Sequence, residues 1–522
     1  MKRRKLPIGI QTFVKIREAD YYYVDKTGFI QRMIDEGSQY FLSRPRRFGK
    51  SLLLDTLAEL FAGHESLFQG LAIHPHWDWT VRYPVLRFSF GGGVVESRAE
   101  LDRRIRDLLH HNQRALGLTC RDPADVVGCF RELIEQAHAA SGQRVVVLVD
   151  EYDKPILDNL TDPEMARTMR DGLRNLYSVI KDNEAHIRFA FLTGVSKFSK
   201  VSIFSGLNNL VDLTIDPAYS SVCGYTEQDV DTVFAPELPG LDWAQIRAWY
   251  NGYNWTGEAV YNPFDLLLLF PKRQFHAWWF ETGTPTFLVD LLARRGFFTP
   301  SLARLRADEA LLSAFDVETM APEALLWQTG YLTFTGSRRI GARVEYTLGY
   351  PNLEVESALN DSLIKALIGE PGRASELTSR LYDVLVAGDF PALRAHLASL
   401  FAAIPYHWQT GNPIAHYEGY YASVFYSHLA ALGLDLIPED ATSRGRIDLT
   451  LKFNQRIWIF EFKVVELEPE RQALQQIKDR GYADKYRALG QPIHLIGIEF
   501  SRDQRTLVGF EVETGPGPRT GD

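Results

Sequence analysis

The stretch RVVVLVD (144–150) constrains the fold of this chain more than any other feature. Positions 145–149 are all apolar, so the segment lacks the alternation of a strand with one face in water. Such a run is typical of a central parallel strand that is buried on both faces. Further apolar runs lie at 39–43, 84–90 and 186–194, and helical patterns lie near 50–63, 98–116, 124–140 and 164–182. This alternation predicts a doubly wound α/β unit with a parallel sheet.

The composition favours a soluble chain of several domains. With 522 residues, of which 45% are hydrophobic and 24% charged, two to four globular domains are expected. A run of about 18 apolar residues is missing, and the basic N-terminus MKRRKLPIGIQTF has no long apolar segment behind it. We therefore expect a cytoplasmic protein without a membrane partner. The net charge of −9 argues against a nucleic-acid surface over the whole chain, so such a contact should be local.

The cysteines predict no disulfide. Cys120, Cys129 and Cys223 stand in unrelated contexts without metal-ligand spacing. We expect three buried thiols in a reducing compartment.

Changes in pattern suggest three segments, at 1–224, 225–400 and 401–522. The middle segment is mostly helical and rich in tryptophan and tyrosine, and we expect its aromatic side chains to form a core. Within it, residues 324–355 predict a helix followed by a β-wing, which fits a lid or a winged-helix module as well as a helical connector. The last segment returns to α/β, with helices near 416–433 and 468–488, a hairpin of 445–453 and 456–465 around Asn454-Gln455, and strands at 493–500 and 506–512.

The stretch FLSRPRRFGKSLLLDTL (41–57) resembles a phosphate-binding loop between a strand and a helix. Gly49 precedes Lys50, which would reach the terminal phosphates, and Ser51 would bind Mg²⁺. Arg44 stands where the usual pattern has its first glycine. A non-glycine residue is acceptable there if its φ stays negative, and Pro45 favours that conformation. The alternative is a basic turn that reads GKS by chance.

Two further elements favour a nucleotide site. The strand in VVVLVDEYDKP ends in Asp150, which can hold the water shell of Mg²⁺, and in Glu151, which can orient or deprotonate the attacking water. The next strand ends in Thr193, where a polar group can sense the γ-phosphate. Alone, the acids would fit a surface turn, but the order of the three elements predicts ATP binding.

A second cluster of candidate residues lies in the C-terminal hairpin. Glu461 and Lys463 are two positions apart on a strand and share one face, and Asp448 on the partner strand can reach that face. A carboxylate pair beside a lysine can bind Mg²⁺ and activate water for phosphodiester cleavage. These residues resemble the D…E-x-K set of the PD-(D/E)XK nuclease superfamily. The resemblance implies that Glu418 on the preceding helix is a further candidate ligand and Gln476 on the following helix a supporting residue. The alternative is a surface ion pair on an edge strand.

The chain resembles the bacterial AAA-ATPase-like family, which commonly carries a C-terminal PD-(D/E)XK nuclease domain. The resemblance rests on YYVDKTGFI, RPRRFGKS, VLVDEYDKP, FLTGVSKFSKVSIFSGLNNL, GYTEQDV and the D…E-x-K residues of the hairpin. It implies ATP and Mg²⁺ as cofactors, with Mn²⁺ an alternative at the nuclease site, and it implies that Arg44 is no defect. Arg46 and Arg47 either neutralise phosphates or are solvated loop charges.

The leading expectation is an ATP-dependent, Mg²⁺-dependent nuclease of bacterial defence or mobile-element biology. Its expected partners are nucleic acid, DNA first, and further copies of the chain. The alternative is a nucleotide-regulated switch whose C-terminal domain binds nucleic acid or protein without cleavage. A third option keeps ATP hydrolysis and makes that domain a dimerisation module.

Overall fold

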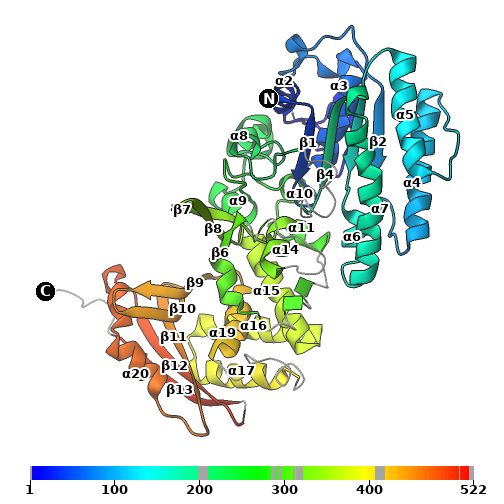
Figure 1. The fold of residues 1–522 in the computed structure, drawn as a ribbon. Coiled ribbons are helices and arrows are strands. Elements are labelled where there is room, and N and C mark those ends of the chain that lie inside the picture. Colours follow the sequence, from blue (N-terminus) through cyan, green and yellow to red (C-terminus); the bar gives the residue numbers. More distant parts are fainter. Residues whose placement is uncertain are drawn as a thin grey trace. The chain divides into compact units, whose positions relative to one another are not determined.

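The computed structural model divides the chain into two compact units (Figure 1). It describes residues 3–197, 210–283, 297–309, 321–405, 418–504 and 506–515, with positions 288, 289, 291, 292 and 312. Unit 1 comprises Met1–Trp279 and Arg306–Asn352, and unit 2 comprises Phe280–Leu305 and Leu353–Asp522. The segment expected at 225–400 is thus shared between both units. The stretch 198–209 of the family resemblance, the helix start at 416–417 and the tail from 516 lie outside the described residues.

A five-stranded sheet of order β2-β3-β4-β1-β5 forms the centre of unit 1. All four strand pairs are parallel, and every residue of β3 is buried, as the apolar run predicts. The strands are β1 (Gln39–Ser43), β2 (Val85–Ser89), β3 (Val145–Asp150), β4 (Ile187–Gly194) and β5 (Val211–Asp212). The predicted parallel α/β sheet is confirmed.

Helices cover both faces of this sheet. On β2, Arg87 pairs with Asp55 of α3, while the adjacent Phe88 packs on Phe130 of α5 with ring centroids 4.8 Å apart. Neighbouring strand residues point to opposite faces, so α3 and α5 lie on opposite sides. Figure 1 shows α4, α5 and α7 side by side. The helices are α1 (Phe13–Glu18), α2 (Thr27–Glu36), α3 (Lys50–Phe61), α4 (Arg98–Leu116), α5 (Val126–Ser141), α6 (Lys154–Leu157) and α7 (Pro163–Asp182).

The rest of unit 1 is helical and ends in a β-hairpin. Its aromatic residues are core residues, as expected: Tyr250, Tyr261 and Phe270 are at most 1% exposed. The hairpin follows α14 and forms a small sheet of order β6-β8-β7, which matches the predicted helix and wing. These elements are α8 (Glu227–Val233), α9 (Trp243–Tyr250), α10 (Pro263–Lys272), α14 (Pro322–Thr329), β7 (Thr333–Ile340) and β8 (Arg343–Gly349), with α11 (Trp278–Glu281) and β6 (Leu305–Asp308) where the chain passes from one unit to the other.

Unit 2 contains a mixed sheet of order β13-β12-β11-β10-β9. The Asn454-Gln455 turn joins β10 to β11, and both of its residues have positive φ, 51° and 56°, as a tight hairpin turn requires. This confirms the predicted hairpin. The strands are β9 (Asp435–Thr442), β10 (Gly445–Phe453), β11 (Arg456–Val465), β12 (Ile493–Ser501) and β13 (Leu507–Thr514). β9 was not expected, because Pro438 and three acids within it obscure its strand pattern.

Both faces of this sheet are covered. Trp458, Phe460 and Phe462 point into a core with α16, α17 and α19, while Ile457 and Ile459 pack with Ile477 of α20. The helices are α15 (Leu353–Ile368), α16 (Pro371–Ala387), α17 (Phe390–Ala403), α19 (Glu418–Ala430) and α20 (Gln472–Asp479). The helix predicted at 468–488 is shorter in the structure and continues as the 3-10 turns Tyr482–Lys485 and Arg487–Leu489. Of the helices that the structure describes, none has the length and apolarity needed to cross a membrane.

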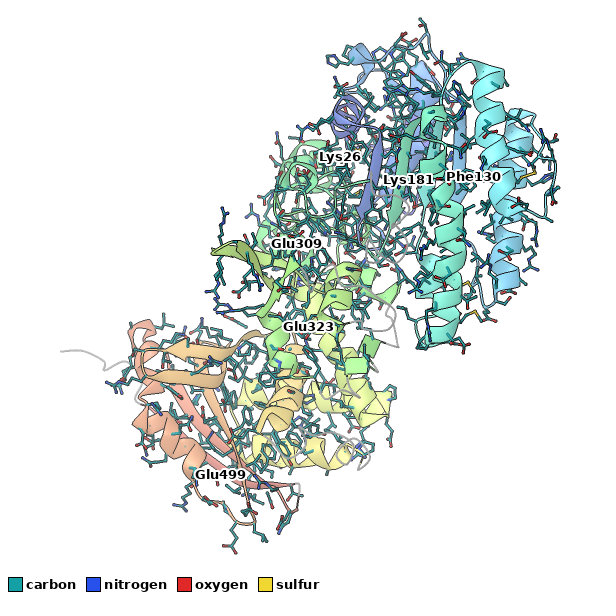
Figure 2. The ribbon with its side chains drawn as sticks, in the orientation of Figure 1. Lys26, Phe130, Lys181, Glu309, Glu323 and Glu499 are labelled. Atoms are coloured by element: carbon teal, nitrogen blue, oxygen red, sulfur yellow. A yellow bond between two sulfur atoms is a disulfide. The ribbon has the colours of Figure 1, made fainter. Side chains whose placement is uncertain are left out.

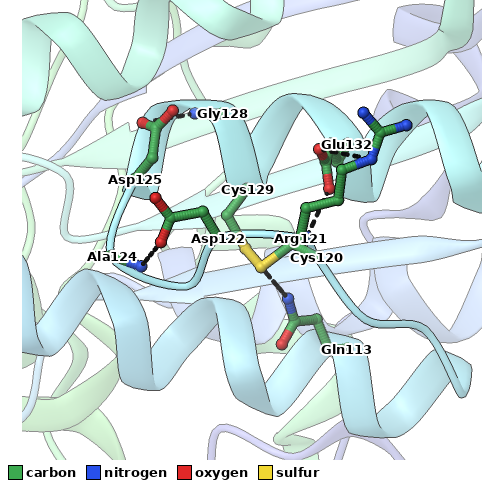
Figure 3. The surroundings of a disulfide bond; sticks show 9 residues. All are labelled: Gln113, Cys120, Arg121, Asp122, Ala124, Asp125, Gly128, Cys129 and Glu132. Carbon is green, nitrogen blue, oxygen red and sulfur yellow. Dashed lines mark hydrogen bonds and ion pairs between the residues drawn. A yellow bond between two sulfur atoms is a disulfide. The ribbon is translucent and has the colours of Figure 1, made fainter.

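The cysteines correct one prediction (Figure 3). Cys120 and Cys129 form a disulfide, with Cα atoms 5.2 Å apart. The chain leaves α4 at Gly117 and turns back into α5 at Asp125, which brings the two residues within bonding distance. The amide nitrogen of Gln113 lies 2.9 and 3.0 Å from their sulfur atoms. Cys223 is a free, buried thiol, as expected.

Two histidines meet in the core of unit 2. The Nε2 atoms of His396 on α17 and His428 on α19 lie 2.9 Å apart, and both side chains are fully buried. Neither Nδ1 atom has a hydrogen-bond partner among the residues of the described ranges. Burial lowers the pKa of His396 to about 4 and that of His428 to about 3. The pair is therefore neutral in the folded protein near neutral pH.

This pair predicts an acid-sensitive contribution to the stability of unit 2, opposite in sign to that of buried acids with raised pKa values such as Asp448 and Glu461. In the unfolded chain the histidines take up protons below about pH 6.5, whereas in the folded protein they stay neutral until about pH 4. Their contribution to the unfolding free energy is therefore full above pH 6.5 and is lost as pH falls towards 4. Each histidine should contribute at most about 1.4 kcal/mol per pH unit. We expect the hydrogen-exchange protection of α17 and α19 to fall over this range, and the double substitution His396→Leu/His428→Leu to remove most of the fall. His110→Leu on the exposed side of α4 is the control. An unchanged pH dependence in the double variant would contradict the assignment.

Candidate functional sites

The phosphate-loop sequence forms a tight turn between β1 and α3. Gly49 precedes the first helical residue with φ 94°, a left-handed conformation that suits glycine, and Arg47 has φ 66°. Lys50 opens α3 and folds back over the loop, where Nζ donates to the carbonyl oxygens of Arg44 at 3.0 Å and Pro45 at 2.9 Å. Burial lowers the pKa of Lys50, while the charge of Asp150 acts in the opposite direction. The lysine is thus held at the loop, close to the acids that end β3.

Arg44 anchors the loop from behind. Its guanidinium is fully buried, donates to the carbonyl oxygens of Thr214 at 3.0 Å and Tyr219 at 3.0 Å, and lies 4.1 Å from the ring centre of Trp255. Its φ is not positive, as the Pro45 argument requires. The arginine therefore replaces the usual glycine without strain and ties the loop to the chain after β5. The sequence alone does not reveal this role, because the partners of Arg44 lie about 170 positions away.

The ends of β3 and β4 lie beside this loop. The strand register pairs Leu42 with Thr193 and Val149 with Leu192, so Asp150 and Thr193 reach the same sheet edge as the loop. Thr193 is fully buried, and within the described part of the chain its Oγ1 has no hydrogen-bond partner. Burial first, and the charge of Asp150 second, raise the pKa of Glu151. A buried polar oxygen without a partner is costly, which fits a site that receives a polar ligand.

The remaining loop arginines differ in their surroundings from Arg44. Arg46 and Arg47 are both exposed, and the guanidinium of Arg47 lies 5.2 Å from the ring centre of Phe264. Ser51 follows Lys50 in the first turn of α3 and is half-buried. Because both side chains are exposed, both remain candidates for phosphate contacts.

Asp153 is a further acid next to this edge. It is 1% exposed and accepts hydrogen bonds from the backbone of Val195 at 3.0 Å and of Ser196 at 2.6 Å, and from the Ser196 hydroxyl at 2.6 Å. These bonds fasten the segment after β3 to the end of β4. Asp153 therefore holds the two strand ends together, and its bonded oxygens make it a poor candidate for a catalytic base.

The second cluster lies on the central strand of the C-terminal sheet. Lys463 Nζ is 3.5 Å from Glu461 Oε1 and 3.3 Å from Glu418 Oε2, and Asp448 accepts a hydrogen bond of 2.8 Å from the backbone of Phe462. The Gln476 amide donates to Glu461 Oε1. The structure thus brings together all five residues that the sequence selects. Because β11 lies between β12 and β10, and Glu461 is 1% exposed, the edge-strand alternative is wrong.

The carboxylates of this cluster are unusual. Burial raises the pKa of both Asp448 and Glu461, and the mutual repulsion of the two acids raises that of Glu461 further. Glu461 Oε2 is buried and lacks a hydrogen-bond partner among the residues described. In the same ranges no three acid, histidine or cysteine side chains converge as a metal cage, and Glu418 contacts the lysine. Two carboxylates suit Mg²⁺, which usually keeps several waters and takes one or two protein carboxylates.

Comparisons with known proteins give matches to the two parts of the chain that carry these residue clusters. Residues 7–204 match the family described as predicted AAA-ATPase, and residues 416–510 match the PD-(D/E)XK nuclease superfamily. A bacterial relative, "Uncharacterized protein in vnfD 5'region" of Azotobacter chroococcum mcd 1, is 66% identical over 515 residues, 98% of this chain and 100% of the relative. The chain belongs to the AAA-ATPase-like family with a PD-(D/E)XK nuclease-superfamily domain. No solved structure matches it.

One residue of this AAA-ATPase-like protein supports the nuclease-superfamily site from a distance. Glu499 on β12, labelled in Figure 2, is 2% exposed and accepts hydrogen bonds from the backbone of Glu470 at 2.7 Å, Arg471 at 3.1 Å and Gln472 at 2.6 Å. A carboxylate at this position caps the start of α20, the helix that carries Gln476. The sequence signal for this role is an acid within the apolar run IHLIGIEF.

The geometry of Arg44 predicts a structural role in this family member. Arg44→Ala removes the hydrogen bonds to the carbonyl oxygens of Thr214 and Tyr219 and a fully buried side chain, so we expect unit 1 to lose on the order of 3 kcal/mol of unfolding free energy. Urea unfolding followed by tryptophan fluorescence measures the loss. Arg46 in the same loop is exposed, so Arg46→Ala should change the unfolding free energy by less than about 0.5 kcal/mol. Equal effects of the two substitutions would contradict the anchoring role.

Proposed function

We propose that this protein binds and hydrolyses ATP through unit 1 and cleaves nucleic-acid phosphodiesters through its C-terminal domain. One observation carries the proposal. Each site contains carboxylates, a lysine and one buried oxygen that has no hydrogen-bond partner in the described ranges. This oxygen is Thr193 Oγ1 in unit 1 and Glu461 Oε2 in the C-terminal domain. Such oxygens are expected where a ligand completes the polar contacts.

At the ATP site, the chain supplies charge and orientation. The backbone N–H groups at the start of α3 face the phosphates, and Lys50 exchanges its two carbonyl partners for phosphate oxygens. Ser51 and Asp150 would hold Mg²⁺, which when bound neutralises charge on the phosphate oxygens. Glu151 accepts the proton of the attacking water, a role that its raised pKa supports. Thr193 donates to the γ-phosphate, and Arg46 and Arg47 neutralise phosphate charge from the loop.

At the nuclease site, Asp448 and Glu461 would hold Mg²⁺ or Mn²⁺, and the bound ion would activate water for attack on the phosphodiester. Gln476 fixes one oxygen of Glu461 and leaves the other free for the ion. Lys463 stabilises charge at the scissile phosphate. Glu418 holds Lys463 at the site through their ion pair, and direct contact with the metal ion is its second proposed role.

The proposed substrate is nucleic acid, DNA first, and the proposed setting is the cytoplasm of a bacterium, in defence or mobile-element biology. Further copies of the chain are proposed partners. Two observations favour a second function, a nucleotide-regulated switch that binds nucleic acid or protein without cleavage. Lys463 already pairs with two acids, and the described residues form no cage of three metal ligands.

The ATP site is tested with two substitutions. Lys50→Ala removes the cation of the loop, so we expect nucleotide affinity to fall at least about a hundredfold, as titration with a fluorescent ATP analogue would show. Glu151→Gln keeps the shape of the side chain but removes the base, so binding should persist while turnover falls on the order of a hundredfold or more. Unchanged affinity in the first variant would exclude the phosphate loop. Normal hydrolysis in the second would assign proton transfer to another group.

The nuclease site is tested independently of the ATPase. Asp448→Ala, Glu461→Ala and Lys463→Ala should each reduce cleavage of DNA or RNA at least about a hundredfold, with ATP hydrolysis intact. Calorimetry with Mn²⁺ should show an ion in the wild type that Asp448→Ala loses. Glu513→Ala on β13 is the control, because it removes an exposed acid of the same sheet. If the wild type neither binds Mn²⁺ at this site nor cuts any nucleic acid, with or without ATP, the switch without cleavage replaces the nuclease.

A further inference from the structure

The outer part of the β7–β8 hairpin reaches beyond the helices of unit 1 (Figure 1). Residues 335–344 are all exposed, from the middle of β7 through the turn to the start of β8, and we call this stretch the β-arm. Ile340 and Val344 are 49% and 40% exposed, so two large apolar side chains face water near its tip. Single exposed apolar residues are common, but here both lie among arginines on a two-stranded ribbon, a structure that is only marginally stable by itself in water.

The hairpin carries an excess of positive charge. Residues 333–349 contain three arginines and one acid, Glu345. Glu345 Oε1 lies 2.6 Å from Arg338 Nη2 and 3.7 Å from Arg306 Nε of β6. Within the ranges that the structure describes, Arg339 and Arg343 form no ion pair. Two guanidinium groups of the β-arm are therefore left for an anion from outside the chain.

The strand register places an arginine beside an apolar side chain on each face of the β-arm. Ile340 pairs with Arg343, and Arg339 pairs with Val344. Residues directly opposite each other share a face, and neighbours along a strand alternate between faces. Arg339 Nε also donates to Gly341 O at 3.2 Å, which holds this side chain at the turn. Both faces of the ribbon can therefore contact phosphate and apolar groups together.

A DNA duplex has the charge and the dimensions that match the β-arm. Its major groove is about 12 Å wide, admits a two-stranded β-ribbon and has a phosphate backbone on either side. The arginine on each face of the ribbon can reach the backbone on its own side, and Ile340 and Val344 can contact thymine methyl groups in the groove. The major groove of duplex RNA is deep and narrow, so the same ribbon does not fit there.

We propose that the β-arm binds the major groove of double-stranded DNA. The inference goes beyond the proposed function, because the β-arm belongs to unit 1 and contains none of the residues proposed for ATP hydrolysis or cleavage. It needs neither nucleotide nor metal ion. The acidic net charge of −9 fits such a local contact, since the chain as a whole does not attract phosphate.

The test measures binding of the full chain to a fluorescein-labelled DNA duplex by anisotropy in EDTA, where metal-dependent cleavage is suppressed. Arg339→Ala/Arg343→Ala should weaken binding at least about tenfold, and should reduce the slope of log affinity against log salt concentration by about 2, because each phosphate contact contributes about 0.9. Ile340→Ala should weaken binding about threefold with the salt slope unchanged, because it removes apolar contact and no charge.

The matched control is Arg103→Ala/Arg106→Ala on the exposed side of α4, which makes the same change in net charge within unit 1. It should leave the affinity and the salt slope unchanged. If the β-arm double variant binds DNA as the wild type does, or if the control loses as much affinity, the β-arm is not the DNA contact.

Hydrogen exchange in the wild type decides the inference without any variant. The amides of residues 335–344 should exchange more slowly with the DNA duplex bound, and an RNA duplex of the same sequence should not slow them. If the wild type fails to bind DNA in EDTA, binds it without slowing this exchange, or gives equal slowing with RNA, the inference is wrong. Cleavage in Mg²⁺ tests the proposed nuclease separately, so a chain that binds DNA through the β-arm but never cuts it overturns only the nuclease.

Discussion

The parallel pairing of β4 with β1 on one side and β3 on the other brings the residues of the proposed ATP site together. It sets Leu42 beside Thr193 and Val149 beside Leu192, and so places the loop, the acids and the threonine at one edge. Parallel strands gain stability only when helices cover both faces, so this edge exists because α3 and α5 bury the sheet from opposite sides. A shift in the register of these strands would move Lys50 away from Asp150 and separate the residues of the site.

In unit 2 the sheet also fixes the positions of the candidate site residues. Glu461 and Lys463 sit on a strand whose alternate residues, Phe460 and Phe462, are fixed in the core. The two ionisable side chains cannot turn away, so they pair with each other and with their neighbours at the cost of desolvation. The packing of the surrounding core offsets this free-energy cost. The same loss of water contact raises the pKa of the acids. Ionisable residues are uncommon in central strands for this reason.

Sequence patterns predicted local features well and distant ones poorly. The apolar run of β3, the hairpin turn at Asn454 and the shared face of Glu461 and Lys463 follow from periodicity and spacing, which act over a few residues. The selection of Glu418 and Gln476 follows from the family resemblance. The disulfide, the anchor at Arg44 and the cap at Glu499 depend on where the chain returns after many residues. Periodicity holds no information about those returns, so the sequence alone predicts separate thiols at Cys120 and Cys129. The metal, nucleotide and substrate roles of the site residues remain predictions.

The outer strand of the C-terminal sheet has a consequence for how copies of this protein meet. β9 pairs with β10 alone, and no other strand of the described ranges covers its free side. An open strand edge invites aggregation, because its unpaired amides and carbonyls can add a strand from another molecule. Pro438 offers no amide donor, and Glu439 bends the backbone with a φ of 51°. This edge is thereby protected against pairing with another chain, so we expect that β9 does not extend the sheet into a second copy of the protein.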